Sequence, residues 1–357
     1  MSTVEAPRQR VTRRVLLVVA LILTFTLLVL VALLLRELQA EDSEPEYRPT
    51  AGIRVLHVLL GPGVGDKPFF RRPMGAAFGK NGRIYVADTG NNRIVVFDRN
   101  GRYLLQFGGL GVGKPAPGGV FSWEPGRLNY PTDVASDNEG NIYVADFRND
   151  QIQVFDSEGR FLRVFPDRTK PVGKGSSGQG GAGIAVTSVT VADHRVYATD
   201  QYQVLVFDTN GTLLSQFGKP GAGPADLDHP NGIAVGPNSM LAVSDSNHNR
   251  VLGLTPGGEF VWGIGRRLGD VTTEQGGEFE VPRGLAYTDD GSIVVADAMA
   301  SRLVRVAGTG KVDGSFGQRG DAPGELNFPT DVDSLGDRLV VAEKGNNRVQ
   351  IVVLDER

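Results

Sequence analysis

Residues 73–109 read PMGAAFGKNGRIYVADTGNNRIVVFDRNGRYLLQFGG, and variants of this stretch recur along the chain. Four of them also begin at a proline, at residues 131, 230, 282 and 329, and a copy without the proline begins at Thr187. In each copy an acidic residue ends the second apolar run. The interval from the proline to this residue is the same in four copies, as in Pro73 to Asp88, and it is one position shorter from Pro329 to Glu343. This spacing indicates one supersecondary unit repeated six times.

Each copy divides into four short strands joined by turns. In residues 73–109 the first strand follows the proline, the second is RIYVAD, the third is RIVVFD and the fourth is YLLQF. The turns KNGR and RNGR contain Asn-Gly pairs, which favour positive φ and therefore tight hairpins. Alternating apolar positions are typical of half-buried antiparallel strands. One such sheet leaves apolar faces exposed, whereas six packed radially bury them, so we predict an all-β, six-bladed β-propeller.

The two ends of the repeat region are predicted to meet in one blade. The sixth copy stops after its third strand, and GIRVLHVLLG at residues 52–61 has the composition of the missing fourth strand. The interval from Gly61 to Pro73 equals the interval from Gly218 to Pro230. We therefore expect residues 53–60 to complete the last blade, which removes the open sheet edges and sets the propeller domain at residues 52–357.

The N-terminal region predicts a membrane anchor. Val15 to Leu35 is an apolar run that only Thr24 and Thr26 interrupt. At a rise of about 1.5 Å per residue, such a helix spans roughly 30 Å, the thickness of a bilayer core. A cleaved signal peptide is the alternative, with Ala40 as a small residue before the cut, although the run is longer than usual for one. We expect residues 15–35 to form one transmembrane helix.

Charge on either side of this run predicts the orientation. Four arginines between residues 8 and 14 precede it, so residues 1–14 are expected to be a basic cytoplasmic tail and the propeller to be extracytoplasmic. Residues 36–51 are acidic, contain two prolines and are predicted to be a solvated tether. The chain has a net charge of −4 and its tail holds four Arg and one Glu (+3), which leaves −7 for the rest. An acidic outer domain predicts no nucleic-acid binding.

The repeat resembles the NHL repeat family of six-bladed propellers across residues 52–357. The matching features are the P-x-[GD]-[VILA]-A start, the YVAD-type second strand with a following Asn, and the G-x-F-x-x-P linker between copies. The resemblance implies the propeller fold. It leaves the function open, because the family includes protein-binding, RNA-binding and enzymatic members. Members with a membrane anchor and an outer sensor domain are similar in layout to this chain.

The enzymatic members give a test on specific residues. The resemblance implies that the family's amidating lyases hold zinc with histidines directly after the repeat prolines. The residues at those positions here are Met74, Thr132, Thr187, Asn231, Arg283 and Thr330, none of which is a zinc ligand. The chain has no cysteine, and its four histidines (His57, His194, His229 and His248) are expected in turns, loops or outer strands. We therefore predict no metal, no cofactor and no catalytic residue.

Two sets of residues are candidates for binding. The first set surrounds the predicted channel mouth, at the start of the innermost strands, and includes two carboxylates and one guanidinium. These groups could bind a small polar ligand, a peptide end or an ion; alternatively, they hydrogen-bond only to one another and to water in the channel. This set comprises Thr132, Asp133, Thr187, Ser188, Asn231, Arg283, Thr330 and Asp331. The second lies on the long loops 109–130, 166–186 and 265–281, which are expected on the same face. It comprises Phe121, Trp123, Lys170, Lys174, Arg266 and Arg267.

A further set is predicted to be structural. The acidic residues that end the second strands occupy equivalent places in separate blades, so they lie far apart and should cap the following loops by accepting backbone N–H bonds. They are Asp88, Asp146, Asp200, Asp245, Asp297 and Glu343.

These observations favour a membrane-anchored, extracytoplasmic binding or scaffolding module for a protein or cell-envelope ligand. The alternative is an extracytoplasmic enzyme of lyase or lactonase type that uses the channel mouth, against which stand the missing histidine ring and the lack of a paired base and nucleophile. A sensory role is a third hypothesis; it requires a partner helix, because the tail before the apolar run is too short to signal alone.

Overall fold

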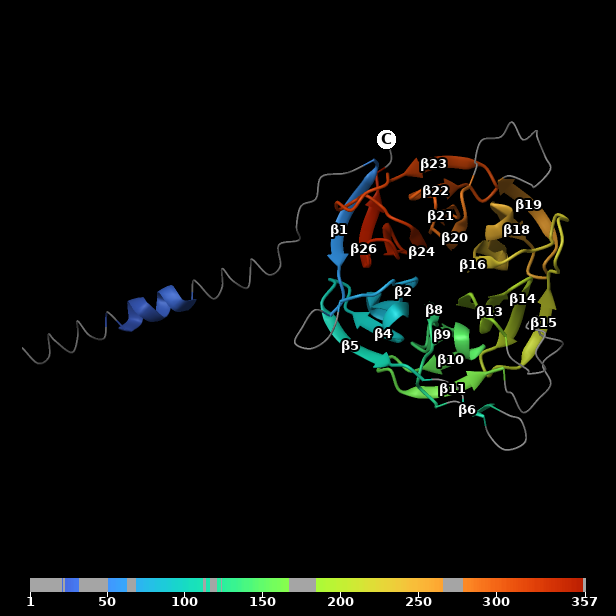
Figure 1. Ribbon diagram of the computed structural model, residues 1–357. Coiled ribbons are helices and arrows are strands. Elements are labelled where there is room, and N and C mark those ends of the chain that lie inside the picture. Colours follow the sequence, from blue (N-terminus) through green and yellow to red (C-terminus); the bar gives the residue numbers. More distant parts are fainter. Residues whose placement is uncertain are drawn as a thin grey trace, which may run out of the picture. The chain divides into compact units, whose positions relative to one another are not determined.

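The computed structural model describes residues 21, 23–31, 51–62, 69–111, 114–115, 121–122, 124–166, 184–265 and 279–355. The chain divides into two units, Met1–Glu46 and Tyr47–Arg357. In the first unit, residues 23–31 are helical (Figure 1). No helix within the described residues is long and apolar enough to cross a membrane. The predicted tail 1–14, most of the predicted span 15–35 and nearly all of the tether 36–51 lie outside the described residues.

The second unit is a six-bladed β-propeller, as predicted (Figure 1). Each blade is a four-stranded antiparallel sheet, and the first strands of neighbouring blades contact one another around the centre. From the centre outward the strands are β2 (Gly75–Phe78), β3 (Ile84–Asp88), β4 (Arg93–Phe97) and β5 (Tyr103–Gly108) in blade 1; β8 (Pro131–Ser136), β9 (Ile142–Asp146), β10 (Gln151–Phe155) and β11 (Phe161–Phe165) in blade 2; β12 (Ser188–Ala192), β13 (Arg195–Asp200), β14 (Gln203–Asp208) and β15 (Leu213–Phe217) in blade 3; β16 (Pro230–Val235), β17 (Leu241–Asp245), β18 (Arg250–Leu254) and β19 (Phe260–Gly265) in blade 4; β20 (Pro282–Tyr287), β21 (Ile293–Asp297), β22 (Arg302–Val306) and β23 (Val312–Phe316) in blade 5; and β24 (Pro329–Leu335), β25 (Arg338–Glu343), β26 (Arg348–Leu354) and β1 (Ile53–Leu59) in blade 6.

Short elements connect these strands. A two-stranded ribbon of β6 (Lys114–Pro115) and β7 (Phe121–Ser122) lies between blades 1 and 2. Single 3₁₀ turns follow the first or second strand in several blades: η1 (Lys80–Gly82), η2 (Thr89–Asn91), η3 (Phe147–Asn149), η4 (Pro237–Ser239) and η5 (Ser246–His248).

The predicted closure of the propeller is confirmed. β1 pairs antiparallel with β26, from Ile53 opposite Leu354 to Leu59 opposite Val349. The last blade therefore takes three strands from the end of the chain and its outermost strand from residues 53–59. Closure leaves no gap between the last blade and the first, which removes the edges at which open sheets pair with other chains.

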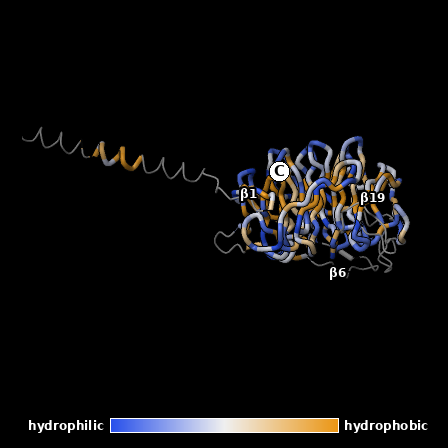
Figure 2. Tube along the Cα trace, turned by 90° about the horizontal axis from the view of Figure 1, so that it is seen from above, coloured by the Kyte–Doolittle hydropathy of each residue, from blue (hydrophilic) through white to orange (hydrophobic). Residues whose placement is uncertain are grey.

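The core consists of six apolar clusters, one at each junction between neighbouring blades. The second and third strands are buried on both faces because each blade is covered by a neighbour on either side, and β3 and β4 contain no exposed residue. Tyr85, Tyr143 and Tyr197 repeat at one position of the second strand and fill three of these junctions. In the outermost strands, by contrast, half-buried and exposed residues alternate, as in β5 and at the start of β11. Figure 2 shows hydrophobic stretches within the propeller and hydrophilic residues at the loops of its two faces.

The acidic residue at the end of each second strand is buried and has a structural role. The Asp88 carboxylate accepts the backbone N–H of Arg71 at 2.7 Å and the Nε–H of Arg93 at 2.7 Å. The same two bonds recur at Asp245, Asp297 and Glu343. The sequence predicted that these carboxylates accept backbone N–H groups of the following loop, as Asp200 does from Gln201. In the four blades above, the carboxylate bonds the following loop, where it does so, only through a side chain, such as that of Asn91, and its backbone partner lies upstream of the first strand, so it fixes where that strand begins.

Candidate functional site

All first strands begin on one face of the propeller, and the residue before the repeat proline adopts an unusual conformation there. Residues that precede proline normally have extended backbone. Here five of them have positive φ values between 51° and 67°: Arg72, Tyr130, His229, Val281 and Phe328. Side chains of left-handed asparagines in the preceding blade hold three of them, because the Oδ1 atoms of Asn347, Asn92 and Asn249 accept the N–H groups of Arg72, Tyr130 and Val281. The rim of the channel mouth is thus fixed by a repeated hydrogen bond between blades.

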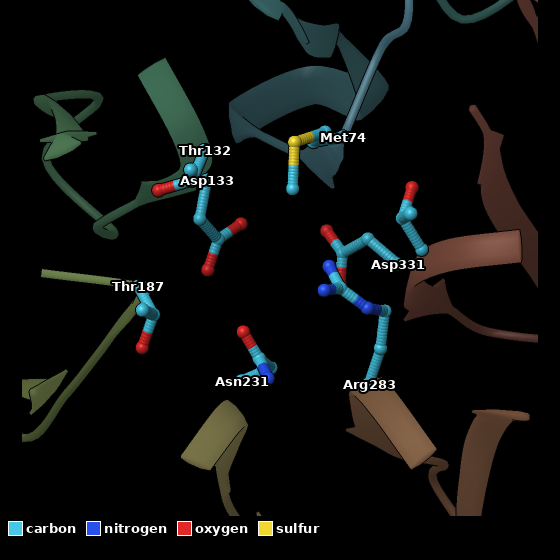
Figure 3. Close-up of a pocket in the computed structure, with 8 residues that line it drawn as sticks. Met74, Thr132, Asp133, Thr187, Asn231, Arg283 and Asp331 are labelled. Atoms are coloured by element: carbon cyan, nitrogen blue, oxygen red, sulfur yellow. The ribbon is translucent and has the colours of Figure 1, made fainter. Parts of the chain in front are cut away.

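Seven of the eight residues predicted to surround the mouth line one pocket there, together with Met74 (Figure 3). The pocket comprises Met74, Thr132, Asp133, Thr187, Asn231, Arg283, Thr330 and Asp331. Ser188 does not line this pocket. Its hydroxyl donates to Asp133 Oδ2 at 2.6 Å, and it faces a second cavity farther along the channel.

The threonines of the mouth connect neighbouring blades. Thr132 Oγ1 donates to the carbonyl of Val186 at 3.3 Å, and Thr187 Oγ1 donates to the carbonyl of Pro230 at 2.6 Å. Thr330 Oγ1 is 3.4 Å from the carbonyl of Pro73. These hydroxyl protons are committed to backbone acceptors, so the threonines contribute chiefly to joining the blades.

Arg283 is different, because its polar atoms make no hydrogen bond or ion pair with any described residue. Its guanidinium extends into the mouth (Figure 3), and its Nε is buried without a partner. Its ring contact is with Phe328, whose centroid lies 5.7 Å from the guanidinium carbon. Burial lowers the pKa of Arg283 from its ordinary value. A guanidinium with open donors at a pocket is suited to bind a carboxylate or phosphate in a bidentate manner.

Lys344 lies close to both Arg283 and Arg72. Lys344 lies over the same aromatic ring, with Nζ 5.2 Å from the Phe328 centroid. Burial lowers the pKa of Lys344, and repulsion from Arg283 and Arg72 lowers it further. We call Arg72, Arg283 and Lys344 the cationic arc; they come from blades 1, 5 and 6. Arg148 extends this chemistry on blade 2, where its guanidinium lies 4.5 Å from the centroid of Tyr130.

The channel beyond the mouth carries three carboxyl groups. Asp133 Oδ2 accepts the N–H of Val189 at 2.9 Å, Asp331 Oδ2 accepts that of Ala76 at 2.8 Å, and Asp333 Oδ2 accepts that of Phe78 at 2.8 Å. Burial raises the pKa of Asp133 and of Asp333 to about 6 each. Burial and repulsion from Asp133 raise the pKa of Asp331 well above its ordinary value. All three line the second cavity, which holds about 740 Å³ of space including open solvent.

The loop residues predicted to bind a partner are not placed. Phe121 belongs to β7, but its side chain lies outside the described part of the structure. The other five also lie outside the described residues: Trp123, Lys170, Lys174, Arg266 and Arg267. They remain predictions.

The four histidines lie in separate environments. His57 belongs to β1, and His194 lies in the turn between β12 and β13. His229 Nδ1 is 2.6 Å from Asp228 Oδ1, and His248 Nδ1 is 2.7 Å from Asp245 Oδ2. In the part of the chain that the structure describes, no three His, Cys, Asp or Glu residues are grouped so as to hold a metal ion.

The sequence did not indicate four residues of this site: Arg72, Arg148, Phe328 and Lys344. A signal for two of them was present, since Arg72 and Phe328 directly precede repeat prolines. Lys344 and Arg148 occupy the short loops after the second strands of blades 6 and 2. Aligning the copies at these two positions, as well as after the proline, would have drawn attention to all four.

Comparison with known proteins agrees with the repeat assignment. The NHL repeat model matches residues 70–97 and 128–155, which cover the first three strands of blades 1 and 2. The protein named brain tumor from Drosophila melanogaster is 32% identical over 151 residues, 42% of this chain and 12% of that protein. NHL repeat-containing protein 2 from Bos taurus is 32% identical over 106 residues, 29% of this chain and 14% of that protein. The chain thus spans about an eighth of the length of these relatives.

Solved structures share the fold at low sequence identity. A virginiamycin B lyase from Staphylococcus aureus superposes with a TM-score of 0.51 at 13% identity, over 79% of this chain and 94% of that one. A gluconolactonase from Xanthomonas campestris has a TM-score of 0.54 at 14% identity, over 87% of this chain and 95% of that one. At such identities the likeness concerns the fold alone.

Proposed function

We propose that this chain is a membrane-anchored, extracytoplasmic propeller that binds a partner protein through the face that carries the channel mouth. One contrast supports the binding face. Several arginines elsewhere on the propeller are paired with carboxylates, as in Arg83 with Glu158 and Arg305 with Asp313. At the mouth, Arg283 and Lys344 stack on an aromatic ring and make no ion pair within the described structure. Arginine and aromatic side chains are enriched at the centres of protein interfaces.

Crosslinking from two sites in one blade tests the binding face. Met299 is 54% exposed in the loop after β21 on the mouth face, and Asp289 is exposed in the turn before β21 on the opposite face. A photo-reactive amino acid is placed at either position in the full chain and activated in cells. We expect discrete protein adducts from position 299 and none from position 289. Equal adducts from both positions, or none from position 299, would argue against a binding face at the mouth.

The anchored topology is a separate part of this proposal and rests on the apolar run 15–35 and the arginines before it. It assigns residues 1–14 to the cytoplasm, 15–35 to the membrane, 36–51 to a tether and 52–357 to the propeller. The chain contains no cysteine, so single-cysteine variants give a clean test with a membrane-impermeant maleimide. We expect Asp289→Cys to react in intact cells and Ser2→Cys to react only after lysis. The reverse pattern would place the propeller in the cytoplasm.

A second candidate function is catalysis of lyase or lactonase type in the channel. The observation that favours it is the set of channel carboxyl groups, because Asp133 and Asp333 have pKa values of about 6 and line a cavity. Groups that titrate near neutral pH in a cavity are suited to general acid and base catalysis. Lactone hydrolysis by the full chain, abolished in Asp133→Asn, would support this function. Turnover that is absent, or unchanged in the variant, would count against it.

A further inference from the structure

We propose that the cationic arc recognises a carboxylate-bearing, acidic segment of the partner protein. This inference rests on the proposed binding function and names the chemistry of what is bound. Neither the Arg283 guanidinium nor the Lys344 ammonium group is directed to a carboxylate or a carbonyl of the described structure, although both side chains are held in place over Phe328.

The positions of these cations are fixed by the fold. Arg283 follows the proline that begins β20, and Lys344 follows the buried Glu343 at the end of β25. Phe328, between them, is held in a left-handed conformation before Pro329. Ring stacking restrains both side chains without using their N–H donors. A bound anion would therefore meet donors that are already oriented, which lowers the entropic cost of binding.

The arrangement is also unfavourable in the absence of an anion. Arg283 and Arg72 are close enough to Lys344 to repel its charge, and Arg283 Nε is buried without an acceptor. A buried polar group without a partner and adjacent like charges both destabilise a fold. A single carboxylate over the arc relieves the repulsion with its charge, and its oxygens accept from the terminal N–H groups of the guanidinium.

Charge favours an acidic peptide over a nucleic acid. The chain from residue 15 onward carries a net charge of −7, so a polyanion would be repelled beyond the arc. The carboxyl groups of Asp133 and Asp331 line the same pocket below the arc, where they oppose an anion that reaches deep into the channel. Aromatic rings beside the cations, such as Phe328 and Tyr130, provide apolar contact for a peptide backbone or side chain. The geometry suits local recognition of one or two carboxylates.

Fluorescence anisotropy on the full chain in detergent tests this inference. The probes are a labelled, capped hexapeptide of alternating Glu and Tyr, its Gln counterpart, and labelled deca-uridylate. The variants are Arg283→Gln and, as a matched control, Arg160→Gln, which removes an exposed cation on the opposite face. We expect the Glu peptide to bind, the Gln peptide to bind at least about tenfold more weakly, and Arg283→Gln to lose about tenfold or more of the affinity for the Glu peptide. Arg160→Gln should stay within about twofold of the wild-type affinity.

The same proteins provide a stability measurement. Replacing Arg283 by Met removes the buried unpaired group, so we expect this variant to unfold at a higher temperature than wild type while failing to bind the Glu peptide. A merely structural arginine would give the opposite change in stability. The inference is overturned if the Glu and Gln peptides bind equally, if no peptide binds, if deca-uridylate or inorganic phosphate binds in their place, or if Arg283→Met lowers the unfolding temperature. Adducts from position 299 in cells that persist in Arg283→Gln would overturn this inference and leave the proposed binding face intact.

Discussion

Replacing Asp333 by Asn is expected to stabilise the propeller at neutral pH. In four other blades the position equivalent to Asp333 holds alanine, as at Ala77 and Ala135, so a carboxyl group at this place is peculiar to blade 6. Its Oδ2 accepts the N–H of Phe78, a bond that the oxygen of an asparagine side chain can also make. The amide nitrogen then faces the channel cavity, where water can bind it. The substitution therefore removes the charge with little change in packing.

The size and sign of the effect follow from the pKa. Burial raises the pKa of Asp333 from 3.8 to about 6, so the native state favours the protonated form. The associated stability is present below about pH 4 and is lost as the pH rises through about 6. At about 1.36 kcal/mol for each pH unit, the loss above pH 6 is about 3 kcal/mol. Asparagine cannot ionise, so Asp333→Asn should avoid this loss. For about 300 ordered residues, that difference corresponds to an increase in Tm of roughly 5 °C.

Thermal unfolding of the full chain in detergent, followed by circular dichroism between pH 4 and pH 8, measures this effect. We expect wild type and Asp333→Asn to have similar Tm values near pH 4 and to diverge as the pH rises to 7. Asp289→Asn, at an exposed turn, is the matched control and should follow wild type throughout. A difference in Tm that does not change with pH, or a variant that is less stable than wild type at pH 7.5, would refute the reasoning.

Three other comparisons test the fold. Arg348→Ala removes the guanidinium whose Nε lies 2.6 Å from the fully buried carboxylate of Glu343, and should lower the free energy of unfolding in urea by about 3–5 kcal/mol. Arg348→Gln should cost less, because glutamine stands at this position in blades 2 and 3, as Gln151 and Gln203. Equal losses in the two variants would be contrary to the ion-pair argument. Gly284→Ala would place a Cβ against Asp331 Oδ1 and should lower Tm more than Gly257→Ala, whose Cβ meets only Thr255 Oγ1 at 3.8 Å, and the reverse order would contradict the close approach. Deleting residues 53–59 removes β1 from the edge of β26, so size-exclusion chromatography should show association; a monomer of unchanged Tm would contradict the closure.

The architecture could be predicted because its determinants are local and repeated. The interval from each of the five repeat prolines to the acidic end of the second strand gives the length of one hairpin, and these five copies together with the one that begins at Thr187 give six blades. Closure was predictable for the same reason, because the interval from Gly61 to Pro73 matches the linkers elsewhere in the chain. A repeat of this kind also indicates which residues face the channel, since the residue after each proline occupies the same place in every blade.

The chemistry of the mouth was only partly predictable. Lys344 and Phe328 are separated in the chain by the whole hairpin of β24 and β25. Their stacking depends on the left-handed backbone of Phe328 before Pro329, and no residue preference predicts that conformation before a proline. Ser188 was placed at the mouth because it begins an innermost strand, but its hydroxyl is bonded to Asp133 and faces the second cavity. Hydrogen bonds between blades decide such details, and they join residues that are distant in sequence.

The most direct test of the binding account combines the crosslinking position with the central cation. A photo-reactive amino acid at position 299 is activated in cells that express the full chain, either with Arg283 or with Arg283→Gln, and the adducts are identified by mass spectrometry. The account predicts a discrete protein adduct with Arg283, whose crosslinked segment is acidic, and its loss in Arg283→Gln while the amount of folded chain is unchanged. An adduct of equal yield in both chains, or one that maps to a neutral or basic segment, would contradict recognition of an acidic segment by the cationic arc, and no adduct in either chain would contradict the binding face.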